Sequence, residues 1–202
     1  MATQTLDVHG KKIALPTGIF INGEFRKALA GRTFPVENPA TGKEIIQVSE
    51  GMPEDVDEAV KVARKTFRSK EYSDFGVMNR AKVMHKLADL MEENFEELVA
   101  LEMIDTGKTR HQASNLDVPA SIGTIRYFAG WCDKVNGQSN FSIPNVFGYT
   151  RREPVGVCGQ IIVSHNTPSQ PKRQSLTRDD NLQPWNFPLL MFTWKVAPAF
   201  AT

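Results

Sequence analysis

The side chains that most often carry enzyme chemistry are scattered along this sequence. Its histidines and cysteines show no metal-ligand spacing with one another, and these residues are His9, His85, His111, His165, Cys132 and Cys158. No nucleophile elbow or phosphate-binding loop occurs, and GVCGQI (156–161) holds only two glycines of a dinucleotide fingerprint, which alone is a weak signal. We therefore predict no metal site and no local nucleophile from residue types.

A polar group in an apolar setting occurs near the end of the chain. Asn186 is flanked by Pro184, Trp185 and Pro188, a pattern typical of a tight corner between a strand and a helix. Read without any family in mind, Asn186 is a turn residue. Any chemistry at this corner depends on the elements on either side of it.

Those two elements are both apolar. Residues 156–162 read as a buried parallel strand, and the run from Phe187 to Ala201 is apolar all round apart from Thr193 and Lys195. A helix of that composition is expected to be buried on every side in a large fold. We expect whatever covers it to lie outside these 202 residues.

In the upstream sequence, apolar residues first recur at every second position and then recur with the spacing of a helix. Residues 18–25 and 32–50 predict two hairpins or a meander, with turns at Asn22-Gly23 and Thr41-Gly42. Helices are predicted from Pro53 through Phe67, over about 78–104 with Gly107 as the stop, and over about 119–135. Strand character returns after Gly137.

Composition excludes several classes of partner. The 202 residues are 41% hydrophobic with a net charge of +1, so a folded core is expected and no excess field attracts nucleic acid. No apolar run reaches membrane-spanning length, and no secretory leader is recognisable, so we expect a cytoplasmic protein. Cys132 and Cys158 each lie in an apolar pattern that predicts a buried, reduced thiol.

Ordered motifs along almost the whole chain outside 163–183 resemble the aldehyde dehydrogenase family. They are INGEF, FPVENPATGKEI, DVDEAVKVARKTF, LADLMEENFEELVALEMIDTGKT, IRYFAGW, and YTRREPVGVCGQI followed by PWNFPLLM. The resemblance implies an α/β fold, NAD or NADP as cofactor, an aldehyde substrate and a homo-oligomer. The implied reaction begins with attack of a cysteine thiolate on the aldehyde and continues with hydride transfer to the nicotinamide; a glutamate base then activates water for thioester hydrolysis.

The resemblance also assigns roles to residues at the corner. It implies that the Asn186 side-chain amide donates to the oxyanion, and that Ile161, Ile162, Pro184 and Trp185 form a wall of the cofactor site. A simple apolar strand end accounts equally well for those four wall residues. Asp105 resembles a position linked to a structural monovalent cation, although an aspartate at a helix end needs no ion.

The same family pattern also shows what these residues lack. The motifs of its catalytic cysteine and glutamate have no match here, and neither Cys132 nor Cys158 has the context of the nucleophile. We therefore expect this chain alone to be inactive and do not expect it alone to bind the cofactor. The alternative is a non-catalytic product that associates with full-length subunits or misfolds.

A polar stretch separates the predicted strand from the corner. Residues 163–183 number 21 and include few apolar side chains, which predicts a disordered insertion. Val163-Ser164 and Gln183 are compatible with splice-site codons, so a retained intron is one explanation and a genuine insertion the other.

The predicted fold is an incomplete aldehyde dehydrogenase-like α/β fold, with N-terminal hairpins and helices followed by the first strand and helix of a Rossmann-like domain. The predicted parts are 1–136 for the N-terminal part of the cofactor domain, 137–155 for the start of an oligomerisation arm, 156–162 for the strand, 163–183 for the insertion and 184–202 for the corner and helix.

Overall fold

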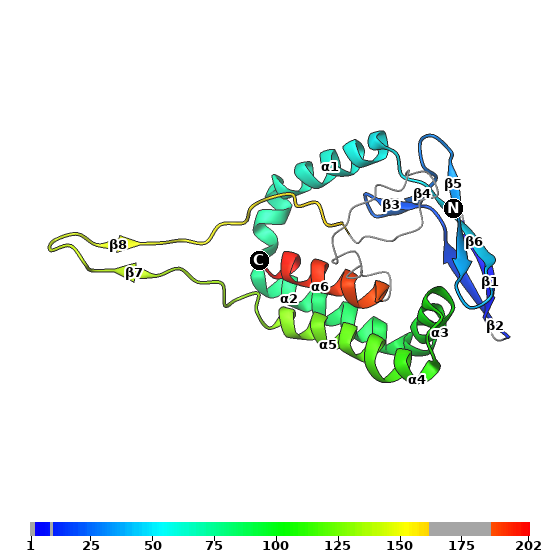
Figure 1. The fold of residues 1–202 in the computed structure, drawn as a ribbon. Helices are drawn as coiled ribbons and strands as arrows, with labels where there is room; N and C mark the ends of the chain where they lie inside the picture. The colour runs from blue at the N-terminus through cyan, green and yellow to red at the C-terminus, as the bar shows by residue number, and fades with distance from the viewer. Residues whose placement is uncertain (1–2, 9, 162–186) are drawn as a thin grey trace, which may run out of the picture.

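The computed structural model describes residues 3–8, 10–161 and 187–202 (Figure 1). Hairpins lie at one end, a group of helices fills the middle and an extended arm projects from the other end. Of the predicted corner, Ile162, Pro184, Trp185 and Asn186 lie outside the described residues, as does the insertion.

Three antiparallel hairpins begin the chain. Their strands are β1 (Thr3–Val8) with β2 (Lys11–Pro16), β3 (Ile19–Ile21) with β4 (Glu24–Arg26), and β5 (Thr33–Asn38) with β6 (Lys43–Ser49). Asn22 and Gly23 have φ angles of 57° and 80°, which two-residue hairpin turns require, so this predicted turn is confirmed. The β1–β2 hairpin was not predicted, although its alternating residues carry the signal.

The helices follow the hairpins. They are α1 (Pro53–Phe67), α2 (Lys70–Glu93), α3 (Phe95–Thr106), the short α4 (Arg110–Gln112), the π-helical turn η1 (Ala113–Asp117), α5 (Val118–Ala129) and α6 (Pro188–Ala201). The helix predicted over 78–104 is divided at Asn94, and the one predicted over 119–135 ends at Ala129. Gly107 ends α3 at a φ of 72°, as predicted.

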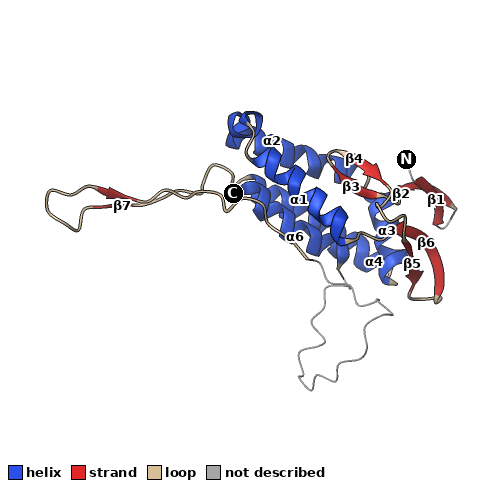
Figure 2. Ribbon diagram, turned by 90° about the horizontal axis from the view of Figure 1, so that it is seen from above, coloured by secondary structure: helices blue, strands red, loops and turns tan. Residues whose placement is uncertain are grey.

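Close packing of α2, α5 and α6 forms the core (Figure 1), and Figure 2 shows the helices grouped between the hairpins and the arm. Small residues at the helix contacts are fully or almost fully buried, and they are Ala88, Ala113, Ala129, Ala197 and Ala201. Such residues let helix axes approach closely, while Val99, Val118 and Ile125 fill the remaining space. No helix within the described ranges is both long and apolar enough to cross a lipid bilayer.

Helix α6 is buried on one face only. Leu190, Thr193 and Ala197 face the core, whereas Phe192 and Trp194 are about half exposed. Burial on every side, predicted from its composition, is therefore not observed among the described residues.

An extended arm leaves the helices after α5. It carries the two-residue strands β7 (Ser139–Asn140) and β8 (Gly148–Tyr149), which pair in antiparallel fashion, and it projects away from the rest of the chain (Figure 1). The exposed fractions of Phe141, Phe147 and Tyr149 are 73%, 64% and 72%. These rings contact one another in sequence along the arm.

The predicted fold class is confirmed in its mixture of hairpins and helices, but the described part of the strand predicted over 156–162, residues 156–161, is not a strand. Residues 156–161 have no ladder partner, and Ile162 lies outside the described residues. A strand inside a parallel sheet obtains its backbone hydrogen bonds from neighbours on both sides, and all sheets in the described ranges are isolated two-stranded hairpins.

Candidate functional site

The segment before the corner is poorly covered. Val155 is 94% exposed and Ile161, the described member of the predicted cofactor wall, is 81% exposed. The segment is joined to α6 by a hydrogen bond from the Gln160 side-chain amide to the backbone carbonyl of Lys195, at 2.7 Å. The segment therefore lies beside α6 without being packed into the core.

The segment after the corner makes helical and side-chain contacts from its first described residue, Phe187. Pro188 occupies the first turn of α6, where its missing N–H costs nothing, and the Met191 N–H donates to the Phe187 carbonyl at 2.9 Å. Phe187, the residue next to Asn186 in sequence, places its ring under Lys108, whose Nζ lies 3.6 Å from the ring centroid.

Lys108 belongs to a buried group of charged side chains. Its Nζ donates to Asp117 Oδ2 at 2.5 Å and lies 3.8 Å from Glu102 Oε1, and Asp117 is fully buried. Asp117 ends the π-helical turn η1, and Gly107, the α3 stop, immediately precedes Lys108. Two irregular backbone features therefore bring this ion pair together.

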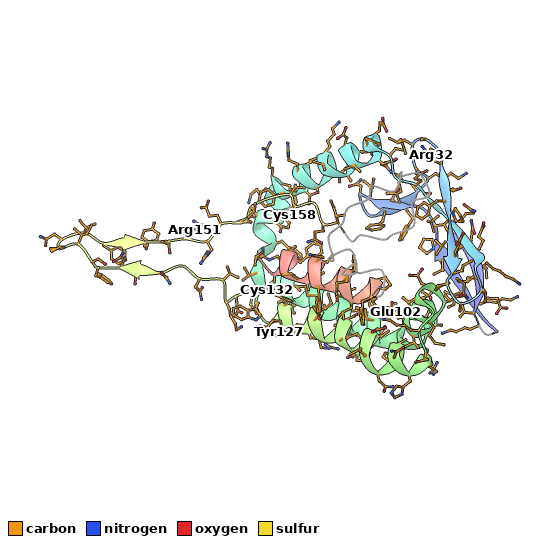
Figure 3. The ribbon with its side chains drawn as sticks, viewed as in Figure 1. Arg32, Glu102, Tyr127, Cys132, Arg151 and Cys158 are labelled. Carbon is orange, nitrogen blue, oxygen red and sulfur yellow. The ribbon has the colours of Figure 1, made fainter. Side chains whose placement is uncertain are left out.

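Glu102 connects the charged group to α6. Figure 3 labels it on α3 near the beginning of α6, and its side chain is 4% exposed. Leu189, in the first turn of α6, lines the same pocket as Glu102. Burial raises the pKa of Glu102 to about 7, against the opposing effect of Lys108.

Asp105 lies one turn away, in a pocket of about 350 Å³ between the hairpins, α3 and α6. The pocket is mainly apolar, with Val36, Ile46 and Leu189 among its lining residues, and desolvation raises the pKa of Asp105. Among the residues that the structure describes, no three or more His, Cys, Asp or Glu side chains are grouped to hold a metal ion.

The two cysteines differ in environment. Cys132 is 4% exposed and contacts the Met84 sulfur at 3.8 Å, and burial raises the pKa of its thiol. Cys158 is exposed, so its predicted burial is wrong, because the strand that would have buried it does not form. Both thiols are free (Figure 3).

Comparison with known proteins decides the family. A model of the aldehyde dehydrogenase family matches residues 25–175. The chain belongs to the aldehyde dehydrogenase family. Similar relatives include an aldehyde dehydrogenase of Alternaria alternata, 45% identical over 190 residues, and the mouse aldehyde dehydrogenase, cytosolic 1, 43% identical over 186 residues. These alignments cover 93% and 92% of this chain and 33% of each relative.

Solved aldehyde dehydrogenases share its fold. The NAD+ complex of the Bacillus cereus enzyme superposes with a TM-score of 0.80 at 41% identity, over 93% of this chain and 34% of that one. A Burkholderia cenocepacia protein solved as a possible aldehyde dehydrogenase gives 0.77 at 34% identity. The chain thus spans about a third of the length of the relatives that it matches.

The buried charged group of this aldehyde dehydrogenase family member was missed in the sequence. Glu102 interrupts the apolar run of residues 98–104 in α3, which is a detectable signal because an unpaired buried carboxylate is costly. Asp117 carried no such signal, because the π-helical turn that points it inward is not visible in a helical pattern.

Proposed function

We propose that this chain supplies the N-terminal part of an enzyme that oxidises an aldehyde to a carboxylic acid with NAD+ or NADP+. The family match over residues 25–175 carries this proposal. Family members are oxidoreductases, and the similar Bacillus cereus enzyme was solved with NAD+. Aldehyde identity is left open, since the chain spans a third of its relatives.

The described residues alone do not form a dinucleotide cradle. Cofactors of this kind bind beyond the carboxyl ends of parallel strands, and within the described ranges no two strands run parallel. Ile161 is exposed rather than part of a wall. We propose that Ile161, Ile162, Pro184 and Trp185 contact the cofactor once the remaining two thirds of the family fold are present.

The catalytic role that we propose for this chain is oxyanion stabilisation by Asn186. An amide N–H held in place donates to the negative oxygen that develops when a thiolate adds to the aldehyde carbonyl. Phe187, the residue after Asn186 in sequence, lies under the Lys108 ammonium and accepts a hydrogen bond from the Met191 N–H. Cys132, buried with a raised pKa, is unsuited to act as the thiolate.

A chimera tests this function. Residues 1–162 are joined to 184–202 and then to the matching remainder of the Alternaria alternata relative. We expect NAD(P)+-dependent aldehyde oxidation, and we expect Asn186→Ala to lower kcat about 10²- to 10³-fold. Asn136→Ala, at an exposed position before the arm, is the matched control. A folded chimera without activity contradicts the function, and full activity in Asn186→Ala contradicts the oxyanion role.

We also propose that the polypeptide of these 202 residues is inactive alone. It contains no match to the family's catalytic cysteine and glutamate motifs. Purified polypeptide with aldehyde and NAD+ should give no NADH absorbance above a heat-treated sample. Turnover that is proportional to protein concentration contradicts this.

A second candidate is a non-catalytic chain that associates with other subunits through the arm at 137–155. The exposed rings of Phe141, Phe147 and Tyr149 favour it, because a solvated row of aromatic side chains is typical of an interface. Co-purification with a full-length subunit, lost in Phe141→Ser/Phe147→Ser, supports association and homo-oligomer formation. Retention in that variant argues against the arm.

The division of the chain and its cellular location are also proposals. We propose the boundaries 1–136, 137–155, 156–162, 163–183 and 184–202, with 163–183 as a retained intron. A transcript that joins the codons of Ile162 and Pro184 supports this, and one that keeps the intervening codons in most molecules contradicts it. Cytoplasmic localisation is supported by the similar mouse protein, which is named cytosolic, and microscopy of a tagged chain tests it.

A further inference from the structure

One face of α1 carries a compact group of cations near its C-terminal end. The group follows the spacing i, i+3, i+4 and i+7, which places its side chains on one side of the helix, and its members are Lys61, Arg64, Lys65 and Arg68. All four side chains are exposed, and α1 lies at the edge of the group of helices (Figure 1). We call these four residues the α1 basic cluster.

The α1 basic cluster surrounds a hollow in the surface of the helix. The hollow has a volume of about 390 Å³, and its lining is completed by Asp57 and Val60. This volume is within the range of small-molecule sites. The two lysines are four residues apart, as are the two arginines, so the Cβ atoms of each pair are about 5–6 Å apart. Long, flexible side chains at this spacing can converge on a single ligand.

The carboxylates of α1 do little to neutralise the cluster. Glu58 pairs with Arg26 at 2.6 Å, and Asp55 is buried and accepts backbone hydrogen bonds. The pKa of Glu58 is lowered mainly by Arg26, and the charge of Lys61 adds a smaller effect. Among the residues that the structure describes, no member of the cluster forms an ion pair. In the hollow, four cations therefore face one carboxylate, that of Asp57.

The helix dipole does not account for this arrangement. Cations are favoured near the C-terminal end of a helix, but the effect falls off within one turn, and Lys61 lies more than one turn before the end of α1 at Phe67. Like charges four residues apart also destabilise a helix. Elsewhere on the helices, Lys70 and Arg110 have carboxylate partners at the surface. The cluster thus contains repulsion that a bound anion would relieve.

We propose that the α1 basic cluster binds a small polyanion with two or more linked phosphate groups. Guanidinium groups match phosphate oxygens with two parallel hydrogen bonds, and the ammonium groups of lysine add point charges. Linked phosphates present several anionic oxygens across the hollow, so one ligand can contact all four cations. The lining contains no aromatic ring, so the phosphates are the part that is recognised. This site does not depend on the function proposed above.

Calorimetric titration of the 202-residue chain with inorganic tripolyphosphate at low ionic strength tests the site. We expect saturable binding that Arg64→Gln/Arg68→Gln weakens about tenfold or more. Glutamine is a good helix former and both positions are exposed, so the variant should fold, and circular dichroism checks this. Lys11→Gln/Lys12→Gln, at exposed positions in β2, removes the same net charge and should weaken binding less than about twofold. Equal weakening in both variants overturns the site.

The carboxylate in the hollow gives a test in the opposite direction. Asp57→Asn removes the charge that opposes an anion, so tripolyphosphate should bind about two- to threefold more tightly. Unchanged or weaker binding would place the anion elsewhere and contradict the site. Added salt should weaken binding to the wild-type chain, because exposed charges are screened, and binding that is insensitive to salt would also contradict it.

Other anions test the class of ligand. Orthophosphate should bind about tenfold or more weakly than tripolyphosphate, and citrate, which carries three carboxylates, should also bind more weakly because it lacks phosphate geometry. Equal affinity for citrate would show attraction by charge alone and overturn the phosphate assignment. ATP carries the same chain of three phosphates, so comparable affinity supports recognition of phosphates. Tight binding of ATP without binding of tripolyphosphate contradicts it.

A membrane surface is the other source of clustered phosphates. Sedimentation with vesicles of phosphatidylcholine and phosphatidylserine measures it. A small ligand is favoured because the apolar part of the hollow is a single valine, Val60, whereas helices that bind membranes insert larger apolar side chains. Vesicle binding that is lost in Arg64→Gln/Arg68→Gln, in a chain that does not bind tripolyphosphate, would overturn the assignment to a small polyanion.

Discussion

The two apolar segments on either side of residues 162–186 differ in secondary structure. Residues 154–161 are mostly exposed, and the Gln160 side chain bonds to α6, whereas residues 188–201 form a helix with one face fully buried. A helix satisfies its backbone internally and needs a partner for one face only, while a strand needs neighbours for its backbone as well. The apolar composition that they share therefore does not decide which of them forms regular secondary structure.

The largest expected effect lies in the buried ion pair of Lys108 and Asp117, beside the beginning of α6. Lys108→Met leaves Asp117 buried without its cation, which should lower the free energy of unfolding by about 3–5 kcal/mol. Chemical denaturation followed by circular dichroism measures it. Arg110→Met, at an exposed ion pair, should cost no more than about 0.5 kcal/mol. Equal losses in both variants would remove the distinction.

A matched pair of isoleucines compares burial directly. Ile125→Ala in α5, at a position 1% exposed, should lower the free energy of unfolding by about 2–4 kcal/mol. Ile161→Ala, at a position 81% exposed, should change it by less than about 0.5 kcal/mol. Urea unfolding of the two variants checks this. A large loss in Ile161→Ala would show that the segment before the corner is packed after all.

The pH dependence of stability reports on Glu102. Its pKa is about 7 in the folded chain and 4.5 ordinarily, so the folded state binds its proton more tightly. The stabilisation from Glu102 is complete below about pH 4.5 and is lost as the pH rises through about 7, by roughly 2–3 kcal/mol. Glu102→Gln should remove this decline in denaturation midpoints between pH 5 and 8. A variant that keeps the decline would assign it to another group.

The smallest effect is expected where the two segments meet. Gln160→Ala removes the hydrogen bond to the Lys195 carbonyl at an exposed site, so the free energy of unfolding should fall by about 0.5 kcal/mol or less. Thermal unfolding with Gln138→Ala, an exposed arm residue, as control measures it. A loss above about 1.5 kcal/mol would mean that the segment before the corner contributes to the core.

Local signals predicted much of the fold. Signals for turns and helix ends depend on only a few neighbouring residues. They include the Asn22-Gly23 turn, the acidic first turn of α1 and the helix stop at Gly107, so these features follow from the sequence. The division at Asn94 was missed because the apolar stripe continues across it. The strand over 156–162 was predicted from composition, and composition does not supply the neighbouring strands that it needs.

The candidate site was predictable in part. Asn186 and the family came from motif order, and the family is confirmed, while the role of Asn186 stays a prediction. The buried charged group of Lys108, Glu102 and Asp117 could not be read from spacing, because it joins a loop, a helix and a π-helical turn through tertiary contacts. Burial raises the pKa of Glu102 against the opposing effect of Lys108, and no local pattern indicates that burial.

The unequal exposure of the two cysteines makes thiol reactivity a measure of how residues 156–161 are covered. Cys158 lies in a pocket formed by residues 154–160, α6 and the end of α1, while Cys132 is shielded in the core. A thiol reagent should therefore label one site rapidly and the other only after global unfolding. If another protein pairs strands with residues 156–161, the fast reaction should disappear. The rate of a single chemical reaction then reports the covering of this segment.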